Sequence, residues 1–181
     1  IMSWLWSLCC GGADDRSSHY LTQTAPPIQS TAIFFPDSKL LCRDFLKGEQ
    51  CRRGARCNFE HGETSLFKFI QWLRTARQTL DVCVYTITSD DITNEILAAK
   101  QRGVRVRVIT DDGQANNRGS DIQTIKAAGI EVRDDGHHAD YMHHKFAVLD
   151  SKMLLNGSFN WTVHAILKNQ ENVVMTTDPA L

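Results

Sequence analysis

The residues best suited to chemistry are concentrated in one short segment of the chain, residues 141–160, with one acidic residue further on. The set comprises His143, Lys145, Asp150, Gly157, Ser158, Asn160 and Glu171. An imidazole can attack phosphorus or move a proton, while an ammonium group, a hydroxyl and an amide can neutralise and hydrogen-bond phosphate oxygens. The segment therefore predicts a site for a phosphate ester. The alternative is a strand that carries incidental polar residues.

The spacing of these residues, His-x-Lys-x4-Asp-x6-Gly-Ser-x-Asn, resembles the HKD motif of the phospholipase D superfamily at every defining position. The resemblance implies an α/β fold, a phospholipase D-like mixed sheet flanked by helices. It also implies a set of catalytic residues, namely His143, Lys145, Asp150, Ser158, Asn160 and Glu171. Glu171 matches the acidic residue that orients the histidine in those enzymes. Asp150 has a second interpretation, a structural residue that anchors the turn after the motif.

The chain contains one such motif, with no second His-x-Lys followed by an aspartate. Hydrolysis of a phosphodiester needs attack at phosphorus and protonation of the leaving oxygen, and one histidine cannot conveniently do both at once. Either the chain pairs with itself or it is inactive. The resemblance implies a two-fold homodimer, in which His143 of one copy forms a phosphohistidine and His143 of the other protonates the leaving group. We expect no catalytic metal, because lysines and hydrogen-bond donors neutralise the charge.

A second cluster of candidate ligands lies upstream, with the spacing C-x8-C-x5-C-x3-H. Its members are Cys42, Cys51, Cys57 and His61. Three thiolates and one imidazole complete a tetrahedral zinc shell, and the hydrophilic residues between them need a metal to supply folding energy. The six cysteines of the chain leave disulfides as the alternative. The spacing resembles CCCH zinc fingers, so we expect a structural zinc in a small insertion at residues 39–62.

The same segment, LCRDFLKGEQCRRGARCNFEHG, resembles the RNA-binding members of the CCCH fingers. Phe45 and Phe59 occupy the positions where those fingers stack aromatic rings on bases. Four arginines lie close to them in the sequence, at positions 43, 52, 53 and 56. The alternative is a finger that only braces the fold.

The elements that must position these residues follow from hydrophobic periodicity and capping signals. We expect strands at 31–35, 80–86, 104–110, 130–133, 143–149, 153–156 and 172–177, and helices at 66–76, 90–102 and 120–128. Ser65 is the expected cap of the first helix, and residues 111–119 are expected to form a loop. A turn after Ser158 should lead into a short helix whose N-terminus faces an anion. His137 and His138 belong to an expected loop near the mouth of the site.

At 181 residues the chain can hold one sizeable core and a small appendage. Its formal net charge of −1 excludes a global electrostatic attraction to nucleic acid or membrane, so binding must depend on local patches. We expect a catalytic domain at residues 31–181, preceded by a membrane-proximal segment and linker at 1–30. Residues 1–8 are apolar but fall short of the roughly 20 needed to span a bilayer. They are the end of a longer anchor, or a tag or poorly ordered terminus.

The combination of one HKD motif with a CCCH finger looks like the mitochondrial phospholipase-D-like family called Zucchini. That resemblance implies a single-strand-specific endoribonuclease that makes the 5′ ends of piRNAs from their precursors, in germline RNA-mediated gene silencing and meiosis. It also implies attachment to the mitochondrial outer membrane, with the catalytic domain facing the cytosol, through an anchor missing from this chain. The alternatives are a cardiolipin hydrolase, which needs an apolar channel beside His143, and an inactive RNA-binding scaffold.

Overall fold

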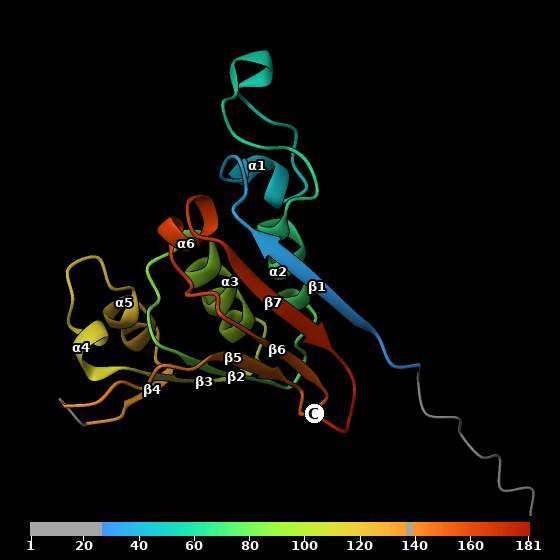
Figure 1. Ribbon diagram of the computed structural model, residues 1–181. Helices are drawn as coiled ribbons and strands as arrows, with labels where there is room; N and C mark the ends of the chain where they lie inside the picture. Colours follow the sequence, from blue (N-terminus) through green and yellow to red (C-terminus); the bar gives the residue numbers. More distant parts are fainter. Residues whose placement is uncertain (1–26, 137–138) are drawn as a thin grey trace, which may run out of the picture.

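The computed structural model describes residues 27–136 and 139–181 (Figure 1). Its strands are β1 Ser30–Phe35, β2 Thr79–Val84, β3 Arg105–Thr110, β4 Glu131–Asp134, β5 Lys145–Leu149, β6 Met153–Gly157 and β7 Glu171–Thr176. Its α-helices are α1 Arg43–Leu46, α2 Ser65–Arg74, α3 Asp90–Gln101, α4 Asp112–Ala115, α5 Ile122–Ala127 and α6 Val163–Leu167, with a 3-10 turn at Gly54–Arg56. Within the described ranges, no helix is both long and apolar enough to cross a bilayer.

The strands form one mixed sheet in the order β1-β7-β6-β5-β2-β3-β4. β2, β3 and β4 are parallel neighbours, whereas β1, β7, β6 and β5 pair antiparallel along the rest of the sheet. This topology brings the carboxyl ends of β2, β3 and β6 to the same edge as the amino ends of β5 and β7. We call the side of the sheet formed by these strand ends the site edge. The opposite strand ends, where β2 and β3 begin, form the far edge.

The helices pack on one face of the sheet (Figure 1). The apolar stripe of α2 is fully buried there, through Leu66, Phe69, Ile70 and Leu73. Fully burying such a side chain stabilises the fold by about 1.5–3 kcal/mol. The core continues to Trp161, whose ring packs edge-on against Phe69 at 5.4 Å. The expected α/β architecture, a mixed sheet with helices packed against it, is confirmed.

The other face of the sheet carries apolar side chains that the described helices do not cover. Phe34, Ile109 and Val174 are 68%, 42% and 41% exposed. A hollow of about 300 Å³ lies on the same face, lined in part by Cys83, Ile109 and Phe146. An exposed apolar face of this kind on a folded domain usually marks an interaction surface.

Three local expectations differ from the structure. The cap of α2 is Thr64, whose hydroxyl accepts the Phe67 N–H at 3.2 Å, while Ser65 lies inside the helix and donates to the Phe34 carbonyl. The expected loop at 111–119 contains α4, because Asp111 accepts the Gln114 N–H and nucleates a turn. The motif strand begins at Lys145 rather than at residue 143.

Candidate active site and zinc-ligand cluster

Five of the six residues expected to be catalytic lie at the site edge. His143 lies two residues before β5, and Lys145 is the first residue of that strand. Ser158 and Asn160 follow the end of β6, and Glu171 begins β7. Because β5, β6 and β7 are adjacent and neighbouring strands lie about 4.8 Å apart, these side chains come from three successive strand ends.

Hydrogen bonds hold the Glu171 carboxylate in place at the start of β7. The Ser158 hydroxyl and a Glu171 carboxylate oxygen form a short hydrogen bond. Asn169 Nδ2 donates to the other carboxylate oxygen at 3.0 Å, and the Asn172 N–H donates to Ser158 Oγ at 3.2 Å. The expected hydrogen bond between His143 and Glu171 is not formed, because Ser158 faces Glu171 across the β6–β7 pair and engages its carboxylate. Asn169 had no signal in the sequence.

Lys145 lies between this acidic group and the histidine. Its Nζ donates to the main-chain carbonyl of His143 at 2.7 Å. Burial lowers the pKa of Lys145, and the nearby Glu171 carboxylate opposes that shift. A partly desolvated ammonium group interacts more strongly with a phosphate oxygen than one in bulk water does.

Tyr85, which the sequence analysis missed, completes the wall of the site. Its ring centroid lies 4.7 Å from that of His143, edge to face, and 5.1 Å from Lys145 Nζ. Gln114 Nε2 donates to its hydroxyl at 3.0 Å. Burial, with the charge of Asp111 and the nearby Tyr141, raises the pKa of Tyr85, so the phenol stays protonated. The available signal was its position after the carboxyl end of a parallel strand, where sites of α/β proteins gather.

Two further motif residues complete the arrangement. Asn160 Oδ1 is buried and has no hydrogen-bond partner among the described residues, which is unusual for a buried amide oxygen. The His144 ring packs edge-on against Phe146, with 5.7 Å between the ring centroids. The unsatisfied Asn160 amide, at the site edge after β6, leaves a polar group available to a bound molecule.

Asp150 lies at the far edge, five residues along β5 from Lys145, or about 16 Å. Its carboxylate accepts the N–H groups of Arg77, Gln78 and Thr79 at 2.7–3.1 Å. Burial would raise the pKa of Asp150, but these backbone donors outweigh it and the pKa lies below its usual value. The structure therefore separates Asp150 from the other motif residues and supports its structural interpretation.

The short helix expected after Ser158 is α6, but its N-terminus is capped by the chain itself. Thr162 Oγ1 accepts the Ala165 N–H at 3.0 Å, so this donor is not directed at an external anion. The histidine pair at 137–138 lies outside the described residues.

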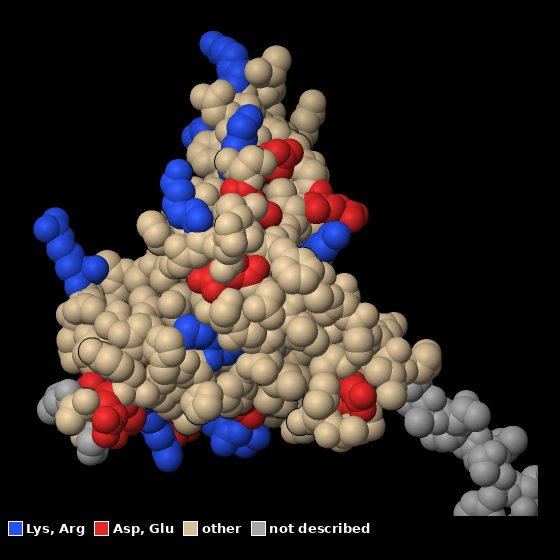
Figure 2. Space-filling model, viewed as in Figure 1, with Lys and Arg blue, Asp and Glu red and all other residues tan. Residues whose placement is uncertain are grey.

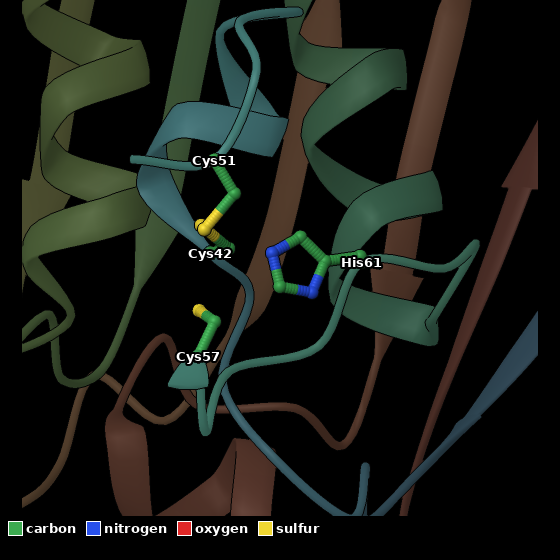
Figure 3. A group of neighbouring side chains, drawn as sticks. All are labelled: Cys42, Cys51, Cys57 and His61. Atoms are coloured by element: carbon green, nitrogen blue, oxygen red, sulfur yellow. The ribbon is translucent and has the colours of Figure 1, made fainter. Parts of the chain in front are cut away.

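The four expected zinc ligands point toward a common centre (Figure 3). Their ligand atoms all lie within 4.8 Å of one another, and the sulfurs of Cys42 and Cys51 are 3.6 Å apart. That separation far exceeds the roughly 2.05 Å of a disulfide, and Cys42, Cys51 and Cys57 are free thiols. Hydrogen bonding with His61 lowers the pKa of Cys51 to about 6, whereas burial raises the pKa of Cys57. Three sulfurs and one imidazole nitrogen at this spacing fit tetrahedral zinc.

Two of the arginines around this cluster form ion pairs with aspartates. Arg43 contacts Asp90 and Asp91 at 3.1 and 2.9 Å, which ties the finger segment to α3. Asp44 holds Arg52 at 2.8 Å, and this hydrogen bond lowers the pKa of Asp44.

The aromatic residues of the finger also divide. Phe45 packs against His61 and Phe67, so its ring supports the finger internally. Phe59 is 37% exposed, and the Arg53 guanidinium lies 5.0 Å from its ring centroid. Figure 2 shows Lys and Arg side chains projecting from the finger at the top of the view, with acidic side chains among them. The exposed stacking surface is therefore Phe59 with Arg53.

A second group of possible metal ligands consists of Asp111, Asp112 and Asp135. Asp111 Oδ1 accepts the Gln114 N–H at 2.9 Å, and Asp135 Oδ1 accepts the Asp112 N–H at 3.1 Å. These contacts cap the first turn of α4 and attach it to the loop after β4.

Comparison with known proteins agrees with this geometry. The mixed sheet, with the histidine and lysine of an HKD motif at one edge, defines a protein of the phospholipase D class. Residues 69–181 match the family model described as "Cardiolipin synthase, PLD-like domain", and residues 40–62 match that of the CCCH-type zinc finger. The chain therefore belongs to the phospholipase D-like family.

Curated relatives refine this assignment. The chain is 50% identical over 149 residues to a protein of Chlamydomonas reinhardtii named mitochondrial cardiolipin hydrolase. The match covers 82% of this chain and 66% of the relative. It is 40% identical over 153 residues to the human protein of that name, with 81% of this chain and 60% of the relative covered. The chain thus spans less than two thirds of the length of these relatives.

Solved structures share the fold. The phospholipase D family member Nuc from Salmonella typhimurium superposes with a TM-score of 0.66 and 23% identity, over 85% of this chain and 86% of that one. NucT from Helicobacter pylori superposes with a TM-score of 0.64 and 21% identity, over 85% and 88% of the two chains.

Proposed function

We propose that two copies of this chain form a phosphodiesterase that cuts single-stranded RNA without a catalytic metal. The observation that carries the proposal is the arrangement at the site edge. His143 and Lys145 are joined at the start of β5, the unsatisfied amide of Asn160 follows the end of β6, and Ser158 holds the Glu171 carboxylate at the start of β7. This set supplies one nucleophile and no second proton donor of the same kind, so a second copy is needed to complete the reaction.

The proposed reaction has two steps. His143 of one copy attacks phosphorus and forms a phosphohistidine, while the bond to the leaving oxygen breaks and His143 of the other copy gives that oxygen its proton. The second histidine then removes a proton from water, which attacks the phosphohistidine, breaks the P–N bond and frees the RNA strand that carries the phosphate, together with the first histidine. Lys145 and Asn160 of both copies bind the phosphate oxygens and stabilise the charge of the transition state.

The uncovered sheet face supports the pairing of two copies. Exposed Ile109 and Val174 lie on it, together with the hollow beside Phe146. A two-fold axis brings the same residue of both copies together, as a composite site requires. The distance between the two copies of His143, expected to be a few ångströms, tests this pairing directly.

The finger supports RNA as the substrate. Phe59 and Arg53 offer a ring and a guanidinium at the protein surface, which can stack on an unpaired base whatever its sequence. A zinc ion bound by Cys42, Cys51, Cys57 and His61 would fix the loop that carries them. The role in piRNA biogenesis implied by the Zucchini resemblance remains a prediction.

Cardiolipin hydrolysis to phosphatidic acid at the mitochondrial outer membrane is the second candidate. Relatives that match over four fifths of this chain bear the name mitochondrial cardiolipin hydrolase. Tyr141 is 72% exposed and packs against Tyr85 beside His143, which gives an acyl chain an apolar surface near the site.

The experiment compares labelled single-stranded RNA with cardiolipin vesicles, using wild type and His143→Ala in buffer without added metal ions. We expect RNA cleavage by the wild type and none by the variant. Lipid turnover without RNA cleavage would favour the second candidate, and RNA binding without hydrolysis of either substrate would favour an inactive scaffold.

Wild type and His143→Ala can be mixed in varying proportions and allowed to exchange subunits, and the activity of the mixtures tests the composite site. Because both copies of His143 are needed, activity should follow the square of the wild-type fraction. A linear fall would show that each chain works alone.

A further inference from the structure

A basic cavity lies on the helical side of the molecule, away from the residues of the proposed reaction. It has a volume of about 550 Å³ and lies between α2, α3 and the end of α1. Its lining residues are Lys47, Arg74, Arg77, Asn94, Glu95, Ala98 and Arg102. Four of these seven side chains are cationic and one is acidic, in a chain whose formal net charge is only −1.

One of the four cations has a structural role. Arg74 donates to both Glu95 oxygens at 2.9 and 2.6 Å and to the Leu46 carbonyl at 2.8 Å. These bonds join α2 to α3 and to the finger segment. They also neutralise Glu95, the acidic residue of the cavity, so the remaining charge there is positive.

The other three cations have no comparable role. Lys47, Arg77 and Arg102 are exposed, and none of them forms an ion pair with a described carboxylate. Each follows the end of a helix, α1, α2 or α3, so its backbone is fixed while its side chain remains available. Three unpaired cations around one concavity form a surface suited to phosphate groups.

The position of the cavity favours a membrane over RNA as its partner. Arg77 and Arg102 precede β2 and β3 at the far edge, about 20 Å along the strands from the site edge. The polypeptide also enters the described domain at the far edge, where the Gln29 N–H bonds Thr177 Oγ1 at 2.8 Å, just beyond the end of β7. A planar surface can contact both places at once, whereas RNA at His143 would have to pass around the domain to reach the cavity.

We infer that this cavity binds the phosphate headgroups of an anionic membrane surface, with the far edge toward the lipid and the site edge toward solvent. The described chain then enters the domain, at Gln29, on the lipid side. The inference concerns a surface separate from His143. It fits a substrate that reaches the site from solvent, such as RNA, because this orientation holds His143 away from the lipid.

The test is partition of the full chain onto phosphatidylcholine vesicles that contain an increasing share of phosphatidylglycerol. The test variant Arg77→Gln/Arg102→Gln removes two of the unpaired cations. The control variant Arg118→Gln/Lys126→Gln removes two exposed cations from the segment between α4 and the end of α5. Both change the net charge equally, and thermal unfolding checks that both fold.

We expect the test variant to partition roughly tenfold to thirtyfold more weakly at low salt, since each cation near an anionic surface contributes a several-fold gain in affinity. The control should match the wild type, and added salt should remove the difference. Equal partition of all three proteins would overturn the inference. So would a loss of affinity of the test variant for single-stranded RNA while its vesicle binding stays intact, since RNA would then be the partner.

Discussion

Replacing Asp150 with asparagine should destabilise the fold and leave the chemistry at His143 intact. The Asp150 carboxylate accepts three backbone N–H groups at the far edge, from Arg77, Gln78 and Thr79. Asparagine keeps one oxygen but directs an NH₂ group at the Arg77 donor. Residue 150 has a φ of +53°, which asparagine adopts readily, so the variant isolates the hydrogen bonds from backbone strain.

The size of the effect follows from the loss of charge. Hydrogen bonds to an ionised group contribute about 1.5–3 kcal/mol each, roughly twice as much as neutral ones. Losing one bond and weakening the others should therefore cost about 2–3 kcal/mol. For a domain of this size that corresponds to a decrease in Tm of roughly 5–10 °C.

The dependence on pH provides a second check on Asp150. Its folded-state pKa lies below the unfolded value of about 3.9, so its contribution is present above that pH and is lost as the pH falls through the folded-state pKa. The stability difference between wild type and Asp150→Asn should be constant near neutral pH and should shrink below about pH 4.

The assay is denaturant unfolding across this pH range, with phosphodiesterase activity measured well below Tm. Asp134→Asn, at the exposed end of β4, is the matched control and should leave both quantities unchanged. A variant at position 150 with wild-type stability and no activity would refute the reasoning, because Asp150 would then act in the reaction itself.

Three further outcomes are expected. Tyr85→Phe should retain most of the phosphodiesterase activity, whereas Tyr85→Leu should reduce it at least about tenfold. The reason is that the ring contacts His143 and its cation–π contact stabilises charged Lys145, and steady-state kinetics against pH measure the effect. Gly157→Ala should destabilise the fold by at least about 2 kcal/mol in urea unfolding, because a Cβ there would lie 2.0 Å from the Asn172 carbonyl oxygen. Chelating zinc should expose residues 42–61 to protease while the sheet keeps its hydrogen-exchange protection.

Each of these outcomes has a contrary result. Equal activity of both Tyr85 variants would remove the ring from the site, and a stable Gly157→Ala protein would mean that β6 and β7 can separate without cost. Unchanged protease resistance after chelation, matched by Cys51→Ser, would show that the finger segment folds without metal.

Local patterns predicted much of the fold and of the zinc-ligand cluster. The stripe of α2 and the alternation of β3 depend only on neighbouring residues, so periodicity located them to within a few positions. The four zinc ligands lie within twenty residues of one another, and their spacing alone indicated a common centre. The predicted cap of α2 is wrong by one residue, because Thr64 and Ser65 can both cap a helix and serine is the more favoured of the two in sequence.

The sequence by itself determined which residue types are present, that one HKD motif exists, and that strands and helices alternate to give an α/β fold. The tertiary structure decided which of the motif residues meet. Strand order places Tyr85 beside His143 and brings Ser158 to Glu171. The pairing of β2 with β5 puts the backbone donors of Arg77, Gln78 and Thr79 at the Asp150 carboxylate. These contacts depend on strand order and register, which are set by packing of the whole sheet and leave no local periodic signal in the chain.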